Sequence, residues 1–113
     1  MDEFGIFANV KYEAMVDSRF VANFFERNHQ HIMEAIRKIV VSESGYSSEF
    51  RQSNFRQSNY VNEQNKKQPC YIMTRDGFTA LAFGFTGKKA AHFKEAYIKR
   101  FNEMEEQIKY LQS

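Results

Sequence analysis

Residues 16–41 read VDSRFVANFFERNHQHIMEAIRKIVV, and this stretch decides the fold. Asp17 or Ser18 can accept a hydrogen bond from a backbone amide of a first helical turn, so we expect a helix to begin there. Arg27 and Asn28 interrupt the apolar rhythm, and asparagine tolerates the left-handed conformation of a tight turn. Apolar residues then recur with helical period, which predicts a second helix. They are Ile32, Ala35, Ile36, Ile39 and Val40. We therefore predict a helix-turn-helix over residues 18–41.

The side of the second helix away from these residues is predicted to be polar. A rotation of about 100° per residue places four candidates for reading DNA bases there. They are Gln30, Met33, Glu34 and Arg37. His31 and Lys38 lie on the flanks and are candidates for phosphate contacts. An amphipathic helix pair with an ordinary solvated face explains the same pattern, since Glu34 would repel phosphate, and both interpretations stay open on composition.

Length and composition limit the possible classes of protein. A chain of 113 residues fits a single domain, and twelve phenylalanines indicate a packed core. The net charge is only +2, so an argument for nucleic-acid binding must come from the distribution of charge. The single cysteine, Cys70, excludes an intrachain disulfide, and no apolar run is long enough to cross a membrane. We expect a cytoplasmic protein without a signal peptide.

The segments that flank residues 16–41 predict strands. Residues 10–16 alternate between apolar and polar, which indicates a half-buried strand, whereas residues 1–9 have no clear period and are expected to form an arm or a short packed turn. Residues 59–74 contain two strand-forming segments around a polar tip, as in a β-hairpin. In a winged helix such a tip lies against the DNA backbone, where Lys66 and Lys67 would contact phosphates.

A pentapeptide is repeated in tandem before this hairpin. Phe-Arg-Gln-Ser-Asn occupies residues 50–54, the first copy, and residues 55–59, the second copy. Such short copies do not build a solenoid, so we expect one copy to belong to a strand and the other to lengthen the connector. A duplication without function is the simpler interpretation. Arg51 and Arg56 would nevertheless lie near the hairpin, where Arg56 is a candidate phosphate contact.

Two helices are predicted after the hairpin. Thr74 or Asp76 can cap the first, and the second, over residues 88–111, is the longest helix because it contains no glycine or proline. Its apolar positions step by four and three, which is typical of one side of a core helix or of a dimer seam. A homodimer through residues 101–113 is the sharper hypothesis. The candidate contacts are Phe101, Met104, Ile108 and Leu111.

The expected fold class is therefore α+β. The order is an N-terminal strand, a helix-turn-helix, a hairpin wing and two helices, a winged helix-turn-helix-like domain over residues 1–113. Enzymatic and metal sites are not indicated. His29 and His31 point to different sides of a helix, so they cannot bind one metal ion. Residues 84–89 have a lysine where a phosphate-binding loop needs a hydroxyl. We expect no catalytic residue and no cofactor.

Two blocks of the sequence resemble the phage regulatory protein Rha family. The first contains residues 16–22, Arg27-x-His29-x-His31-Ile32 and residues 36–39. The second runs from Tyr71 to Ala90 and continues as Phe93-Lys94-x-x-Tyr97-Ile98-x-x-Phe101-Asn102-x-Met104-Glu105. The resemblance implies a temperate-phage or prophage protein that regulates transcription in a bacterial host. It favours the helix-turn-helix interpretation, in which the partner is duplex DNA.

The lysines of the second block add to the candidate DNA contacts. Lys88 and Lys89 open the last predicted helix, and a helix start also offers amide donors to a phosphate. The alternative is an antirepressor-like module that binds a host or phage regulatory protein. The small net charge, the acidic Glu34 and an apolar seam near the end of the sequence favour it.

Overall fold

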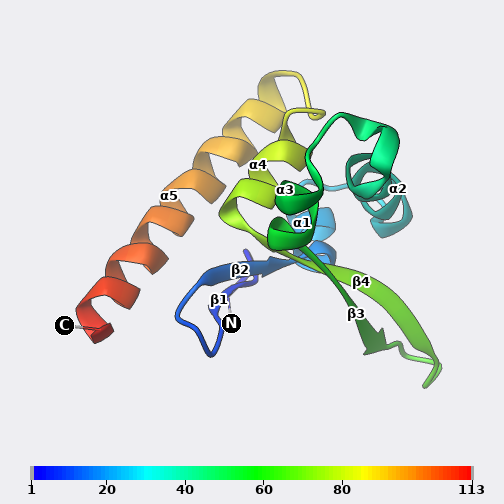
Figure 1. The fold of residues 1–113 in the computed structure, drawn as a ribbon. Coiled ribbons are helices and arrows are strands. Elements are labelled where there is room, and N and C mark those ends of the chain that lie inside the picture. The colour runs from blue at the N-terminus through cyan, green and yellow to red at the C-terminus, as the bar shows by residue number, and fades with distance from the viewer. Residues whose placement is uncertain (1, 113) are drawn as a thin grey trace.

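The computed structural model describes residues 2–112, which form an α+β fold with helices gathered on one side of an antiparallel sheet (Figure 1). The strands are β1 (Ile6–Ala8), β2 (Ala14–Asp17), β3 (Phe55–Val61) and β4 (Lys67–Thr74), and they lie in the order β1-β2-β4-β3. The helices are α1 (Ser18–Phe24), α2 (His29–Val40), α3 (Ser48–Asn54), α4 (Arg75–Ala82) and α5 (Lys88–Gln112), with a 3-10 turn, η1 (Ser42–Ser44). The predicted α+β class is confirmed.

Helices α1 and α2 lie where the sequence predicts two helices joined by a turn. The Asp17 side chain accepts a hydrogen bond from the Arg19 amide at 2.8 Å and caps α1, and Asn28 caps α2 by accepting from the Gln30 amide at 2.8 Å. Glu26, rather than an asparagine, takes the left-handed conformation in the turn, with φ +56°. The β2 strand leads directly into this pair because Asp17 both ends the strand and caps the helix.

The N-terminal strand differs from the prediction. Val10 is 96 % exposed and Tyr12 has φ +62°, so residues 10–13 form a turn rather than a strand. Residues 6–8 instead form β1, whose Ile6 pairs with Val16 of β2. Gly5 lets the chain reach this position, since a Cβ there would lie 2.2 Å from the Phe20 ring. The segment expected as an arm thus contributes a strand to the sheet.

The connector between α2 and the hairpin contains a helix that the sequence analysis did not predict. Ser47 caps α3 by accepting from the Phe50 amide at 3.0 Å, and the first copy of the pentapeptide forms the rest of this helix. The second copy begins β3 at once, which extends the hairpin to residues 55–74. The prediction that one copy belongs to a strand is confirmed, whereas the other copy is helical.

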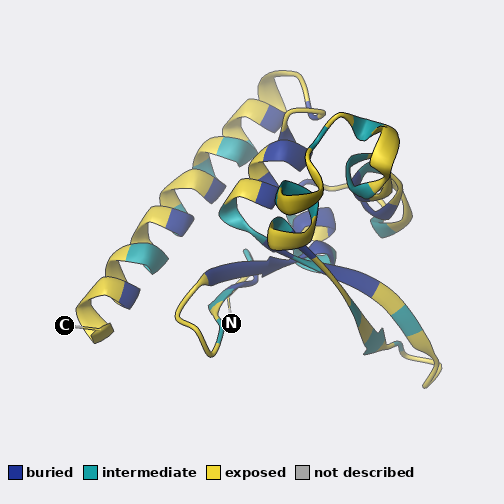
Figure 2. Ribbon diagram, in the orientation of Figure 1, coloured by how far each residue is buried: buried dark blue, intermediate teal, exposed yellow. Residues whose placement is uncertain are grey.

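The helices after the hairpin are as predicted, with Thr74 as the cap of α4 and α5 as the longest helix. Between the sheet and the helices lies an aromatic core around Tyr97, which is fully buried. Its hydroxyl donates to the Phe4 carbonyl at 2.8 Å, and its ring lies 4.7 Å from that of Phe78. Figure 2 shows the buried side of α5 facing the rest of the fold and exposed residues along its outer side.

Candidate nucleic-acid interface

The outward side of α2 is polar and open to solvent. Gln30, Glu34 and Arg37 are exposed, and the Gln30 amide donates to a Glu34 carboxylate oxygen at 3.4 Å. Ile32 and Ile36 on the opposite side are fully buried, so the helix is anchored along one face. The exposure predicted for the three polar residues is thereby confirmed, and their role in reading bases stays a prediction.

Met33 does not belong to this exposed face. The side chain is 4 % exposed, and its sulfur accepts a long contact from the Ser18 hydroxyl at 3.8 Å. The prediction placed Met33 outward because it was based on the apolar stripe of α2 alone. In the fold, α1 packs against α2, and its contacts widen the buried stripe to include this position. Met33 is a core residue.

A buried hydroxyl joins the start of α2 to the rest of the site. The Ser18 oxygen accepts from the Tyr71 amide at 3.0 Å and lies 2.9 Å from His29 Nε2, so it links α1, α2 and β4. Burial lowers the pKa of His29, the nearby Arg19 and Arg37 lower it further, and Asp17 opposes them. His29 therefore serves as a neutral hydrogen-bonding partner at pH 7, and it fixes the beginning of α2.

Two arginines hold the ends of α2. Arg27, in the turn before the helix, places its guanidinium 4.4 Å from the centre of the Phe85 ring. At the other end, Arg51 of the first copy donates to the carbonyls of Val40 and Tyr46 at 3.0 and 3.2 Å. A cation at a helix C-terminus satisfies carbonyls that have no partner within the helix. The flanking candidates His31 and Lys38 are both exposed.

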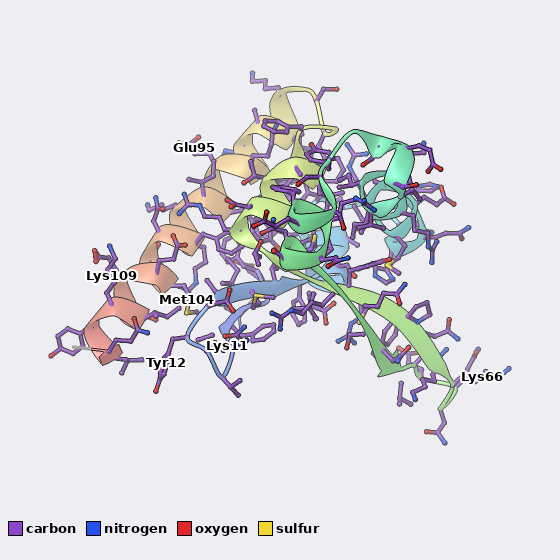
Figure 3. All side chains as sticks on the ribbon, viewed as in Figure 1. Lys11, Tyr12, Lys66, Glu95, Met104 and Lys109 are labelled. Carbon is purple, nitrogen blue, oxygen red and sulfur yellow. The ribbon has the colours of Figure 1, made fainter. Side chains whose placement is uncertain are left out.

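The hairpin projects beyond the helices, and Figure 3 places Lys66 at its outer end. The Asn62 side chain shapes the tip by accepting from the amides of Gln64 and Lys66 at 3.0 and 2.9 Å. Lys67 and Arg56 are exposed on its two strands. Three of the residues predicted to contact phosphate, Arg56, Lys66 and Lys67, thus lie along this projecting hairpin.

The outer half of the hairpin is tied to α1 through Tyr60, the next-to-last residue of β3. The Arg19 guanidinium lies 4.4 Å from the centre of the Tyr60 ring and forms an ion pair with Asp17 at 2.7 Å. The hydrogen bond to Asp17 is the main cause that raises the pKa of Arg19. This arrangement fixes the direction in which the hairpin leaves the fold.

Lys88 and Lys89 begin α5 and are exposed. Lys89 forms an ion pair with Glu26 in the turn between α1 and α2, so the start of α5 lies beside that turn. The structure brings these two predicted residues close to the α1–α2 pair, although Lys89 already has a carboxylate partner.

The predicted dimer seam on α5 is largely part of the core. Phe101 is 1 % exposed and Ile108 is 6 % exposed, and Met104 packs partly against the same cluster. Ile108 is therefore covered within the fold and is not open to a partner, because the helix lies along β1 and β2. Leu111, at 70 % exposed, is the one of the four candidates that faces solvent.

Sequence reasoning missed a groove between α2 and the hairpin. Gln57, Ser58 and Asn59 of the second copy line it on one side, and Met33 and Arg37 line it on the other. Its volume is about 330 Å³, and Tyr71 lies at its base with its hydroxyl accepting from the Gln57 amide at 3.3 Å. The signal in the sequence was the polar pentapeptide itself, but only the strand register shows which side chains reach the groove.

Residues 16–106 match the sequence model of the family described as phage regulatory protein Rha. The chain belongs to this family. The resemblance noted in the sequence is thus confirmed, and the family is described as one of regulatory proteins. No solved structure matches the chain significantly. Within residues 2–112, no three side chains of the metal-binding types lie together, and no helix is long and apolar enough to span a membrane.

Three relatives are similar to this Rha-family chain. An uncharacterized protein of Haemophilus influenzae is 35 % identical over 100 residues, which are 88 % of this chain and 57 % of the relative. An uncharacterized 22.8 kDa protein from the gp15-gp3 intergenic region of Salmonella phage P22 is 34 % identical, over 89 % and 50 % of the two chains. YoqD of Bacillus subtilis, named as a candidate antirepressor derived from the SPbeta prophage, is 29 % identical, over 86 % and 38 %. The chain thus spans about half the length of the first two relatives.

Proposed function

We propose that this Rha-family chain is a phage- or prophage-encoded, DNA-binding transcriptional regulator with a winged helix-turn-helix. In this proposal α1 and α2 are the helix-turn-helix, α2 enters the major groove, and the β3–β4 hairpin is the wing. The chain order supports it, because β2 precedes α1 and α2, and the hairpin follows and pairs with β2 through β4. The family's regulatory description supports the biological setting.

The observation that carries the proposal is the contrast between the two faces of α2. Ile32 and Ile36 anchor one face in the core, while Gln30 and Arg37 project from the other into solvent. A glutamine and an arginine on a rigid helix can each bond two groups of a base edge. Glu34 lies on the same face, where it can accept from a cytosine amino group.

Cations around α2 would hold the DNA backbone. Lys38 and His31 flank the helix, and the remaining candidates come from the hairpin and from the start of α5. They are Arg56, Lys66, Lys67, Lys88 and Lys89. Phosphate would compete with Glu26 for Lys89, because both are anions and the existing pair is exposed.

Fluorescence anisotropy with a mixed-sequence duplex tests the proposal. Binding should weaken as salt is raised, with a log-log slope of roughly −0.9 for each phosphate contact. Replacing Lys66 and Lys67 by alanine should make the slope less negative by about 2, whereas Lys109→Ala, at the far end of α5, should leave it unchanged. A parent protein that does not bind at low salt, or a curve that is flat with salt, would contradict the proposal.

A second candidate function is an antirepressor-like module that binds a host or phage regulatory protein. The name of the Bacillus subtilis relative favours it. The surface also offers an aromatic patch, where Tyr46 stacks on Phe50 and Phe83 is 75 % exposed. A pull-down from nuclease-treated host lysate separates the two functions. A stoichiometric protein partner that is lost in the Phe83→Ser variant, together with no affinity for DNA, would favour the antirepressor.

A homodimer is also proposed, although the structure reduces the surface available for it. Among Phe101, Met104, Ile108 and Leu111, the exposed residue is Leu111 in the last turn of α5. Leu111→Lys should therefore lower the mass found by sedimentation, while Lys109→Ala should not. A parent protein that sediments as a monomer would contradict the dimer.

A further inference from the structure

The groove between α2 and the hairpin has walls that carry hydrogen-bond donors. Gln57 and Asn59 lie two apart on β3, so their side chains point to the same side of the strand, and both are exposed. Arg37 faces them from α2. Two amide groups and a guanidinium together supply up to nine N–H donors. The groove thus has donors on both sides.

The charge of the groove separates it from the other hollows on the surface. Arg37 is the charged side chain among the described residues that line it, and none of them carries a carboxylate. The larger cleft of about 590 Å³ between α3, α4 and α5 contains Glu13, Asp76 and Glu105 beside two cations. We therefore expect an anion to bind more favourably in the groove than in the larger cleft, because the carboxylates of the larger cleft repel it.

The position of the groove relates it to the proposed DNA contacts. One wall is the helix that would enter the major groove, and the other wall is the hairpin that would act as the wing. Between a major groove and the adjacent minor groove runs one sugar–phosphate strand. We infer that the α2–hairpin groove seats this strand, with Gln57 and Asn59 donating to its phosphates and Arg37 supplying positive charge beside them.

This inference rests on the proposed function and adds the binding mode to it. Arginine, glutamine, asparagine and serine are all usual phosphate ligands, and such contacts fix the orientation of a protein on the duplex without reading its sequence. The hydrogen bond from Gln57 to the Tyr71 hydroxyl holds one of the donors at the base of the groove. The second copy of the pentapeptide thereby has a role that the first copy, in α3, does not share.

The test inserts negative charge without changing shape. Gln57→Glu combined with Asn59→Asp puts two carboxylates where the phosphates would lie. Gln52→Glu is the control, because Gln52 is the same residue of the first copy and is exposed on α3. It is compared with the single variant Gln57→Glu, which changes the charge by the same amount. Anisotropy is measured with two duplexes of unrelated sequence, and thermal unfolding checks that each variant is folded.

We expect the Gln57→Glu, Asn59→Asp variant to bind both duplexes about tenfold or more weakly than the parent. Gln57→Glu alone should weaken binding more than Gln52→Glu, whose affinity should stay within about twofold of the parent. If the charged variant fails to fold, Gln57→Ala with Asn59→Ala removes the donors and should also weaken binding on both duplexes. Parent-like binding by the folded variants would overturn the inference that the groove binds the DNA backbone, while leaving the proposed function intact. A loss confined to one duplex would indicate base contacts and overturn it as well. No DNA binding by the parent would overturn both.

Discussion

The two copies of Phe-Arg-Gln-Ser-Asn follow one another directly and adopt different structures. The first copy ends α3, and the second copy begins β3. In the first copy Arg51 caps α2, and Asn54 accepts from the Thr74 hydroxyl at 2.6 Å. In the second copy Arg56 is exposed and Gln57 lines the α2–hairpin groove. Identical residues thus stabilise the fold in one place and are available for binding in the other.

The difference shows that tertiary contacts select the conformation of this pentapeptide. Ser47 caps the helix before the first copy, whereas β4 offers the second copy a strand to pair with. Phe55 is 6 % exposed opposite Met73, but Phe50 is half-buried and stacks on Tyr46. The local preference of the five residues is weak enough for either context to override it.

Deleting one copy of the pentapeptide should have the largest effect on stability. Removal of residues 50–54 or of residues 55–59 yields the same sequence, so one variant tests which structure the remaining copy adopts. We expect the remaining copy to form β3, which buries Phe55 and pairs along its whole length, so that α3 is lost. The loss of the Arg51 and Asn54 hydrogen bonds and of Phe50 packing should lower the free energy of unfolding by about 5 kcal/mol. Urea denaturation measures this change. Hydrogen exchange at Cys70 and Ile72 reports whether β3 persists, because amides alternate along β4 and that of Tyr71 points to Ser18 instead of to β3. Unchanged stability would contradict the structural role of the first copy.

Replacing the two phenylalanines separately comes next in size. Phe55→Ala removes a core ring and should lower the free energy of unfolding by about 3–5 kcal/mol, whereas Phe50→Ala, at a half-buried position, should cost about 1–2 kcal/mol. Denaturation midpoints of the two variants compare them directly. Equal losses, or a larger loss at Phe50, would show that the copies are not packed as described.

The two arginines should give opposite results in two assays. Arg51→Ala removes two hydrogen bonds from a cation to carbonyls and should cost about 2 kcal/mol of stability. Arg56→Ala should change stability by less than about 0.5 kcal/mol, because the side chain is exposed, but it should make the salt dependence of DNA binding less steep by about one contact. If Arg56→Ala binds DNA like the parent, this arginine is not part of the interface.

Much of the architecture could be predicted from local signals in the sequence. Asp17 and Thr74 are caps that stand next to apolar periodic segments, and these signals placed α1, α2, α4 and α5. Helix α3 could not be predicted in this way, since none of its seven described residues is fully buried and it has no apolar stripe. It depends on contacts with distant residues, such as the bond between Asn54 and Thr74.

The candidate interface was predictable only in part for the same reason. Periodicity placed Gln30, Glu34 and Arg37 on the exposed face. It also placed Met33 there, because the packing of α1 against α2 cannot be read from the α2 sequence alone. Gln57 and Asn59 become candidates only in the folded chain, where they line the same groove as Arg37 of α2. Contacts between elements, rather than residue types, decided these positions.

Nuclear magnetic resonance mapping of the backbone amides during titration with a duplex would show which elements contact DNA. We expect the largest shifts in α2 from Gln30 to Lys38, at Gln57 and Asn59, and at the hairpin tip around Lys66, while the end of α5 at Leu111 stays unchanged. Shifts centred on the last turns of α5 or on the patch of Tyr46, Phe50 and Phe83 would refute DNA binding through α2 and the hairpin, as would a spectrum that DNA does not change.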